Sequence, residues 1–154
     1  MVIQRWQSVL LLVAAVMMGL FSFMSLGQFQ GADVTYNFTA LGIMPEGIPT
    51  GGAAPEGQST WYLFVASALS ALLALIDIFL FKNYKAQRRM CAYSILLTCV
   101  ATVLAAWLGY ANEFGEISWS SLVCAPFIAL IAEIMAYQRI VRDNRIIRDS
   151  ERLR

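Results

Sequence analysis

The sequence predicts an all-α membrane protein: an up-down bundle of four transmembrane helices that forms a single domain, residues 1–154. Two observations support this fold class. Four apolar runs each have roughly the 20 residues that a helix needs to cross a membrane, and the segments between them separate into basic and acidic sets. Composition agrees, because 59% of the 154 residues are hydrophobic and 14% are charged, whereas a soluble domain is about 45–50% apolar and about 25% charged.

The first apolar run covers residues 9–26 and follows Arg5 and Trp6. A secretory signal peptide has a similar layout, but its apolar core is only about 7–15 residues long. We therefore expect this run to be retained as the first transmembrane span.

The longest connection is the outer loop, residues 28–59, which is rich in glycine and proline and contains no lysine or arginine. Within it, residues 33–39 alternate polar and apolar side chains, which suits a short strand or one arm of a β-hairpin. From Pro45 onward the composition is typical of an irregular loop. We expect this extracytoplasmic loop to hold at most a short hairpin.

The remaining apolar runs are residues 61–81, 90–111 and 119–138. A basic turn, residues 82–89, joins the second run to the third, and an acidic loop, residues 112–118, joins the third to the fourth. Such short connections favour antiparallel neighbours, which predicts the up-down arrangement.

Two features are predicted for the fourth helix. Pro126 lies in its outer half and should kink it, because the carbonyl group one turn earlier loses its N–H donor. Beyond the apolar run, residues 139–154 contain neither glycine nor proline. We expect the helix to continue through this basic tail as a charged extension in the cytoplasm.

The distribution of charge predicts the orientation. The outer loop and the acidic loop contain no lysine or arginine. By the positive-inside rule the opposite side faces the cytoplasm, so both termini are expected there. The eleven cations lie in three segments: Arg5; Lys82, Lys85, Arg88 and Arg89; and Arg139, Arg142, Arg145, Arg148, Arg152 and Arg154.

Cations of the basic turn and tail are candidate binding residues. Contact with anionic lipid headgroups is worth about 1 kcal/mol per cation near the surface. The alternative is docking to a partner protein with an acidic surface. Asp143 and Asp149 among the arginines argue against nucleic-acid binding, and no nucleic-acid motif is present. The lipid- or partner-binding candidates are Lys82, Lys85, Arg88, Arg89, Arg139, Arg142, Arg145 and Arg148.

Small residues recur at three- or four-residue spacing along each run, which places them on one helix face. Lipid tails give helices no hydrophobic reason to associate, so close packing of such faces must supply much of the attraction. We expect these faces to point into the bundle: Ala15 and Gly19; Ala66, Ser70 and Ala74; Ala101, Ala105 and Gly109; Ala125, Ala129, Ala132 and Ala136.

Asp77 and Glu133 are the only charged residues inside the apolar runs. Each follows a small residue by three or four positions, so both should face the bundle interior. Counted from Lys82 and Arg139, both lie about 8 Å inside the cytoplasmic boundary. The predicted polar pocket at this depth comprises Asp77, Glu133, Gln7, Ser94 and Thr98, with Ser8 at a similar level.

Two interpretations of this pocket stay open. Ionisable groups are costly inside a membrane, so the carboxyl groups are candidates for a proton or cation site that holds at least one proton between them. Alternatively, each carboxylate is hydrated near the interface or paired with Arg5, Arg88 or Arg89, whose long side chains can reach the charge. The shallow depth favours the second interpretation.

The sequence lacks the residues on which most metal and catalytic sites depend. It has no histidine. Cys91, Cys99 and Cys124 lie scattered inside apolar runs, where we expect them to be small buried hydrophobes. Since no nucleophile motif is present either, we expect neither enzymatic activity nor a bound metal or cofactor.

Three parts of the chain resemble a known family. They are residues 1–8 (MVIQRWQS), residues 79–83 (FLFKN) with 87–91 (QRRMC), and residues 147–154 (IRDSERLR). Together they resemble a Bacteroidetes family of small four-helix membrane proteins known only as a domain of unknown function. The resemblance covers essentially the whole chain. It implies an inner-membrane location in a Gram-negative cell and no activity. The family more usually has a small hydroxyl residue where Asp77 stands, so a mechanism built on Asp77 would not extend across it.

The expected function is that of a non-enzymatic accessory or assembly subunit of an inner-membrane protein complex, because exposed segments on both sides of the membrane offer contact surfaces. The alternative is a small transporter, or an ion- or lipid-binding protein, that uses the Asp77/Glu133 pocket. No inverted repeat or pair of broken helices supports transport by one chain, although a homo-oligomer could form a path. Expected partners are anionic lipids, other inner-membrane proteins and further copies of this chain.

Overall fold

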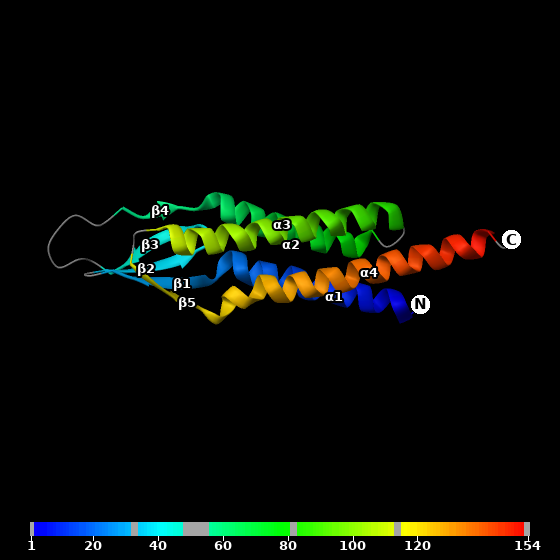
Figure 1. The fold of residues 1–154 in the computed structure, drawn as a ribbon, viewed down its shortest axis with the longest axis horizontal. Helices are drawn as coiled ribbons and strands as arrows, with labels where there is room; N and C mark the ends of the chain where they lie inside the picture. The colour runs from blue at the N-terminus through cyan, green and yellow to red at the C-terminus, as the bar shows by residue number, and fades with distance from the viewer. Residues whose placement is uncertain (1, 32–33, 48–55, 81–82, 113–114, 153–154) are drawn as a thin grey trace.

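The computed structural model describes residues 2–31, 34–47, 56–80, 83–112 and 115–152. Figure 1 shows four long helices side by side, with a small sheet at one end of the bundle. We call this end the sheet end, and the opposite end, where both termini lie, the basic end. The helices are α1 (Val2–Phe23), α2 (Trp61–Phe79), α3 (Tyr84–Ala111) and α4 (Ala125–Arg152).

All four helices are long and apolar enough to cross a membrane. Helix α1 packs against α2 and α4, and α3 packs against the same two helices, so the four form a ring in chain order. Consecutive helices run in opposite directions along the bundle (Figure 1). The predicted up-down arrangement of four helices is therefore confirmed.

The inward faces of the helices carry many small side chains, as predicted. Ala74 on α2, Ala101 on α3 and Ala129 on α4 have no exposed surface. Gly19 on α1 is an exception, because a Cβ atom there would meet no other atom within 4 Å. The other predicted small residues that are buried are Ala15, Ser70, Ala105, Gly109, Ala125, Ala132 and Ala136.

The predicted helical class holds for the bundle but not for the whole chain, because both connections at the sheet end form strands. These strands make one antiparallel sheet in the order β4-β3-β2-β1-β5. The short strand predicted within residues 33–39 is confirmed, while the acidic loop unexpectedly contributes the edge strand β5. The strands are β1 (Ser25–Gln30), β2 (Thr35–Thr39), β3 (Gly42–Glu46), β4 (Gln58–Ser59) and β5 (Glu116–Trp119).

The irregular loop predicted from Pro45 onward can be compared with the structure only in part. Pro45 itself belongs to β3, opposite Tyr36 of β2. Residues 48–55 lie outside the described part of the chain. The outer loop therefore contains two strand pairings beyond the hairpin that its sequence suggested.

One face of the sheet closes the sheet end of the bundle. Phe29, Phe38 and Ile43 are fully buried and share one apolar core with Phe21 of α1 and Leu108 of α3. The ring centroids of the first two phenylalanines lie 5.8 Å apart. Full burial of each such side chain stabilises the fold by about 1.5–3 kcal/mol. The helices and the sheet therefore share one apolar core.

Two helix boundaries differ from the predicted runs. Helix α1 ends at Phe23, earlier than predicted, because Ser25–Gln30 join the sheet. Helix α3 begins at Tyr84, earlier than predicted, and Asn83 caps it by accepting a hydrogen bond from the backbone N–H of Ala86 (3.5 Å). Most of the predicted basic turn is therefore the start of α3.

The fourth helix begins later than predicted, and its proline does not interrupt it. A short 3-10 turn, η1 (Ser121–Cys124), follows β5, and α4 begins at Ala125. Pro126 therefore lies in the first turn, where backbone N–H groups have no acceptor within the helix and a missing one costs little. The predicted helical extension of the tail is confirmed as far as Arg152, and it runs past the ends of the other helices (Figure 1).

Strand β5 approaches its neighbours closely at two glycines. Gly109 of α3 packs against Trp119, and a Cβ atom at this glycine would clash with the indole ring. Gly115, which precedes β5, has a φ of +121°, and a Cβ atom there would clash with the backbone oxygen of Gln30. The turn from α3 into β5 therefore requires glycine at residue 115.

We predict that Gly115→Ala destabilises the protein by about 1–3 kcal/mol, the usual cost of a sparsely populated backbone conformation. The measurement is the unfolding midpoint of the purified protein in mild detergent. Gly19→Ala is the matched control, because its Cβ atom would enter open space. It should be neutral or stabilising by up to about 1 kcal/mol. Equal effects of the two substitutions would contradict this account.

Candidate functional site

Asp77 and Glu133 lie wholly inside the bundle, each with 0% of its surface exposed. Asp77 stands in the last turn of α2, at the end of a buried face that includes Ser70 and Ala74. Glu133 follows buried Ala129 on α4. The predicted inward orientation of both carboxyl groups is confirmed.

The structure does not support pairing of these carboxyl groups with the arginines of α3. Arg88 and Arg89 are exposed, whereas both carboxyl groups are buried. The side chain of Arg5 lies outside the described residues. Bulk water does not reach either carboxyl group, because neither has accessible surface.

Side chains from three helices meet around Glu133. On α3, Ser94 donates a hydrogen bond to Oε1 of Glu133 (2.5 Å), and Thr98 donates to the same oxygen (3.4 Å). The hydroxyl of Ser70 on α2 lies 2.6 Å from that of Thr98. Among the described residues, Oε2 of Glu133 is buried without a hydrogen-bond partner. The structure thus brings Glu133, Ser94 and Thr98 together as predicted.

Asp77 lies beside this group without joining its hydrogen bonds. Glu133 and the thiol of Cys91 are both close enough to act electrostatically on its carboxyl group. A thiol is a weak donor, and neither carboxyl oxygen of Asp77 has a well-formed hydrogen bond within the described residues. The Cys91 thiol also lies 3.7 Å from the backbone oxygen of Glu133, which places it between the two acids.

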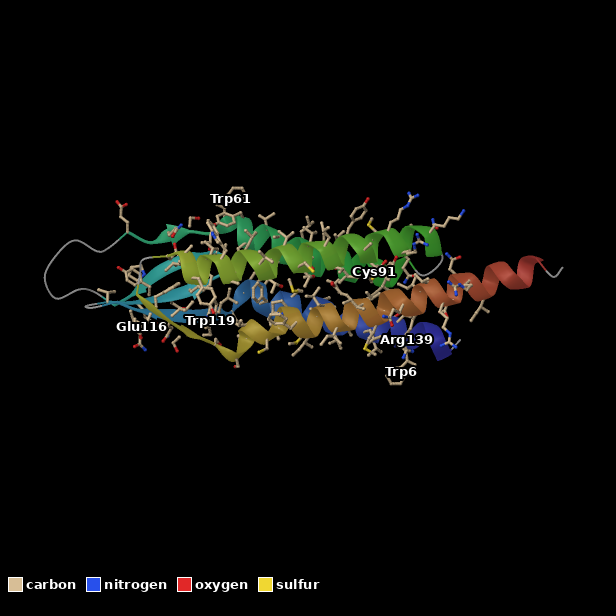
Figure 2. All side chains as sticks on the ribbon, in the orientation of Figure 1. Trp6, Trp61, Cys91, Glu116, Trp119 and Arg139 are labelled. Atoms are coloured by element: carbon tan, nitrogen blue, oxygen red, sulfur yellow. The ribbon has the colours of Figure 1, made fainter. Side chains whose placement is uncertain are left out.

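A glutamine completes what we call the carboxyl cluster. The amide of Gln87 donates to the backbone oxygen of Asp77 (3.4 Å), while its own Oε1 is buried and unpaired among the described residues. Figure 2 shows Cys91, another member, in the half of the bundle away from the sheet. The carboxyl cluster comprises Asp77, Glu133, Ser70, Gln87, Cys91, Ser94 and Thr98. It offers buried oxygen atoms that a proton or a small cation could occupy.

The structure separates Gln7 from the cluster. Gln7 is buried, but its amide donates a hydrogen bond to a carboxylate oxygen of Asp143 on α4. Asp143 lies about 15 Å beyond Glu133, at about 1.5 Å per residue. The prediction is wrong because depth was counted from the apolar run, whereas α1 begins at Val2 and its first turns pack against the extension of α4.

Sequence reasoning missed three members of the cluster. The sequence pattern predicts a packing role for Ser70, the apolar core for Cys91 and a turn for Gln87. A signal was present, because Gln87, Cys91, Ser94 and Thr98 recur at three- or four-residue spacing and therefore share one face of α3. The signal depends on α3 beginning at Tyr84, which places Gln87 on the same helix as Cys91, Ser94 and Thr98.

Comparison with known families places the chain. A family model described as a domain of unknown function, DUF4293, matches residues 3–153. The chain belongs to this family. No curated protein matches it. The predicted resemblance to a family of unknown function is thus confirmed, while a Bacteroidetes origin stays an expectation. Membership in DUF4293 assigns no activity, so the role of the carboxyl cluster must be inferred from its geometry.

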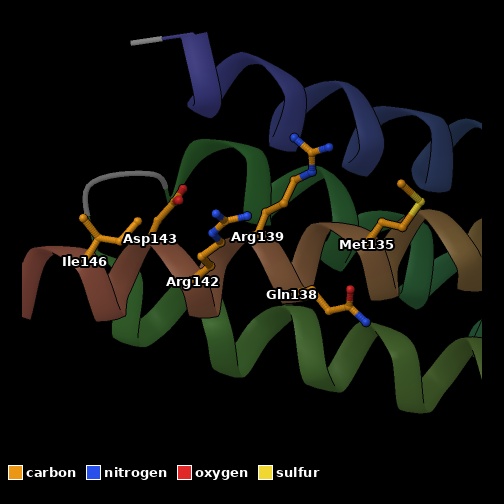
Figure 3. A pocket seen from close by; sticks show the side chains of 6 residues that line it. All are labelled: Met135, Gln138, Arg139, Arg142, Asp143 and Ile146. Atoms are coloured by element: carbon orange, nitrogen blue, oxygen red, sulfur yellow. The ribbon is translucent and has the colours of Figure 1, made fainter.

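This DUF4293 domain also has a groove along the basic extension of α4, with a volume of about 500 Å³. Figure 3 shows Arg139 and Arg142 next to one another, with the guanidinium of Arg139 directed toward α1. The groove is lined by Met135, Gln138, Arg139, Arg142, Asp143 and Ile146. Of the other predicted cations, Lys85, Arg88, Arg89 and Arg145 are exposed, while Lys82 and the side chain of Arg148 lie outside the described residues.

We predict that Ser94→Ala destabilises the protein by about 1–3 kcal/mol, because Oε1 of buried Glu133 loses its closest donor. In a Glu133→Met background the same substitution should cost clearly less, since the carboxyl oxygen that Ser94 serves is gone and only its longer contact to the backbone oxygen of Ser70 (3.3 Å) is lost. Unfolding in mild detergent measures both. Ser118→Ala, at an exposed serine, is the control and should stay within about 0.5 kcal/mol of the parent. Additive effects of Ser94→Ala and Glu133→Met would contradict the contact.

Proposed function

We propose that this protein is a non-enzymatic accessory or assembly subunit of a protein complex in a bacterial inner membrane. In this proposal the four apolar helices span the membrane, the sheet lies outside the cytoplasm, and both termini lie in the cytoplasm. The observation that supports it most directly is the outer edge of β5, at the end of the sheet, which pairs with no further strand among the described residues. An unpaired edge is a ready template for an additional strand from a partner protein.

The hydrogen-bond register identifies which groups β5 offers. The backbone N–H of Ser120 donates to the oxygen of Leu26 (2.9 Å). In an antiparallel ladder, hydrogen-bonded pairs alternate with pairs that are not bonded. The pair of Phe29 and Ile117 is three residues along from the bonded pair of Leu26 and Ser120, so it is not bonded. The backbone N–H and C=O of Ile117 therefore point to the outer edge, and so do those of Trp119. A partner strand would bind these backbone groups.

A partner strand beside β5 would have one face on the core and the other exposed to water, because the side chains of β5 alternate in this way. Glu116 and Ser118 are exposed on one face, while Ile117 and Trp119 pack against the core on the other. An extended partner segment would therefore bind mainly through backbone hydrogen bonds, the mode known as strand addition.

Charge supports the proposed orientation. The basic end of the bundle carries Lys85, Arg88 and Arg89 on α3 and the arginines of α4, whereas the sheet end carries Glu46 and Glu116. Clusters of cations mark the cytoplasmic side of inner-membrane proteins. Anionic headgroups are the first expected contact of the α4 extension, at about 1 kcal/mol per cation, and an acidic partner protein is the second.

We predict that Ile117→Pro lowers recovery of a stoichiometric partner by about tenfold, equivalent to about 1.4 kcal/mol of binding. Proline removes the outward N–H but leaves the bonds between β1 and β5 in place, as is usual for proline on an edge strand. The measurement is affinity purification of the tagged full chain from native membranes in mild detergent, with every co-purifying protein quantified by mass.

The matched control for that experiment is Ile117→Ala. It removes more apolar volume than proline does but keeps the N–H, so it should retain the partner. Loss of the partner in both variants would assign binding to the side chain and contradict strand addition. If the parent protein purified as a monomer or homo-oligomer without any other protein, the accessory role would be contradicted.

We also predict the sidedness of labelling by a membrane-impermeant maleimide. In a variant without Cys91, Cys99 and Cys124, a cysteine introduced by Gln58→Cys should react in intact spheroplasts. One introduced by Lys85→Cys should react only after lysis. Both parent side chains are exposed, so access alone does not separate them. The reverse pattern would overturn the proposed orientation.

A further inference from the structure

We propose that Asp77 and Glu133 form a proton-binding pair inside the four-helix bundle, in which the hydroxyl groups of Ser94 and Thr98 position Glu133. Two observations carry this inference. The two acids, from α2 and α4, lie buried on either side of Cys91, and buried oxygen atoms at the same place lack hydrogen-bond donors among the described residues. The inference goes beyond the accessory role and stands whether or not a partner binds β5.

Four buried oxygen atoms of the carboxyl cluster have no hydrogen-bond partner among the described residues. Within the described residues, the buried side-chain atoms without a hydrogen-bond partner are both carboxyl oxygens of Asp77, Oε2 of Glu133 and Oε1 of Gln87. Buried polar atoms in folded proteins are nearly always paired. An ionised carboxylate can only accept, whereas a protonated one carries an O–H donor. All four atoms belong to one cluster, and a proton supplies the kind of group that this cluster lacks.

The hydroxyl groups cannot make up the shortage. Ser94 has one hydroxyl hydrogen but lies within hydrogen-bond distance of two acceptors, Oε1 of Glu133 (2.5 Å) and the backbone oxygen of Ser70 (3.3 Å). Because that hydrogen is donated to Oε1 of Glu133, Ser94 cannot also serve an unpaired oxygen. A proton on Oε2 of Glu133 or on Asp77 would supply a donor where none is present among the described residues.

No cation faces the pair from the described parts of the neighbouring helices. On α3 the titratable side chain at this level is Cys91, which is near both acids. On α1 the residue packed here is Leu11, in an apolar core with Cys91, Ala136 and Ile140. Two neighbouring carboxylates repel one another strongly at low dielectric, and uptake of one proton removes that repulsion.

The surroundings favour a proton over a larger ion. Within the described residues, no three histidine, cysteine, aspartate or glutamate side chains come together in a way that could hold a metal ion. The cluster lies between two apolar cores, one containing Ala101, Ala129 and Ala132 and the other Leu11 and Ile140. A proton needs neither a coordination shell nor a cavity, so it fits this packed interior.

The test uses the full chain in lipid vesicles and N,N′-dicyclohexylcarbodiimide, an apolar reagent that adds to protonated carboxyl groups. In this addition the acid proton moves to a carbodiimide nitrogen and the carboxyl oxygen bonds to the central carbon. Rearrangement then gives a stable N-acylurea with no leaving group. Peptide mass spectrometry locates the adduct, and infrared spectroscopy detects the C=O stretch of a protonated carboxyl independently of reagent access.

We expect labelling at Asp77 or Glu133 at neutral pH and a protonated-carboxyl band, both lost when Asp77→Asn is combined with Glu133→Gln. Only the protonated form reacts, so labelling should fall by about tenfold per pH unit once the pair ionises. Glu116→Gln, at an exposed acid of β5, is the control and should change neither signal.

Two outcomes would overturn the inference. Absence of the band in the folded parent protein at neutral pH would show that the pair is ionised, whatever the reagent does. Suppression of both signals by sodium, potassium or calcium chloride at constant pH would show that a metal cation displaces the proton. A failure of partner recovery in the Ile117→Pro experiment would leave these signals unchanged, so the two proposals are tested separately.

Discussion

Close approach of α2, α3 and α4 through small side chains is the constraint on which the rest of the structure depends. Ala74, Ala101 and Ala129 have no exposed surface, and small residues at such positions let helix backbones come near one another where apolar surface alone gives no reason to associate. This approach brings a side chain as short as Ser94 to 2.5 Å from Glu133 on the next helix. With larger residues in the interface, the same hydroxyl would not reach the carboxyl group.

The sheet ties the first helix to the last at one end of the bundle. Strand β1 follows directly after α1, and β5 leads through η1 into α4, so the pairing of β1 with β5 joins the first helix to the last. Phe38 and Trp119 lie in contact across this sheet, with ring centroids 6.4 Å apart. The sheet thereby holds α1 beside α4 at one end, and the hydrogen bond between Gln7 and Asp143 holds them at the other.

The two ends of the bundle and its interior differ in physical character, which separates the proposed roles. The sheet end presents a short free edge made of backbone groups, and the basic end presents an arginine-lined groove. Between them, the carboxyl cluster is isolated from both by apolar cores. A partner strand at β5 and a proton at Asp77 and Glu133 therefore use different atoms and different forces.

The sequence by itself determined the number of helices, their alternating direction and the inward position of Asp77 and Glu133. The length of an apolar run and the helical spacing of its small residues are local properties, so they can be read from each run separately. Tertiary structure alone decided the sheet, because Glu116–Trp119 has strand character only when β1, distant in the chain, offers its edge. Tertiary structure also decided that Gln7 pairs with Asp143 and not with Asp77 or Glu133, because the depth of Gln7 depends on where α1 begins. Gln87 and Cys91 join the cluster because of where α3 begins and which of its faces packs inward.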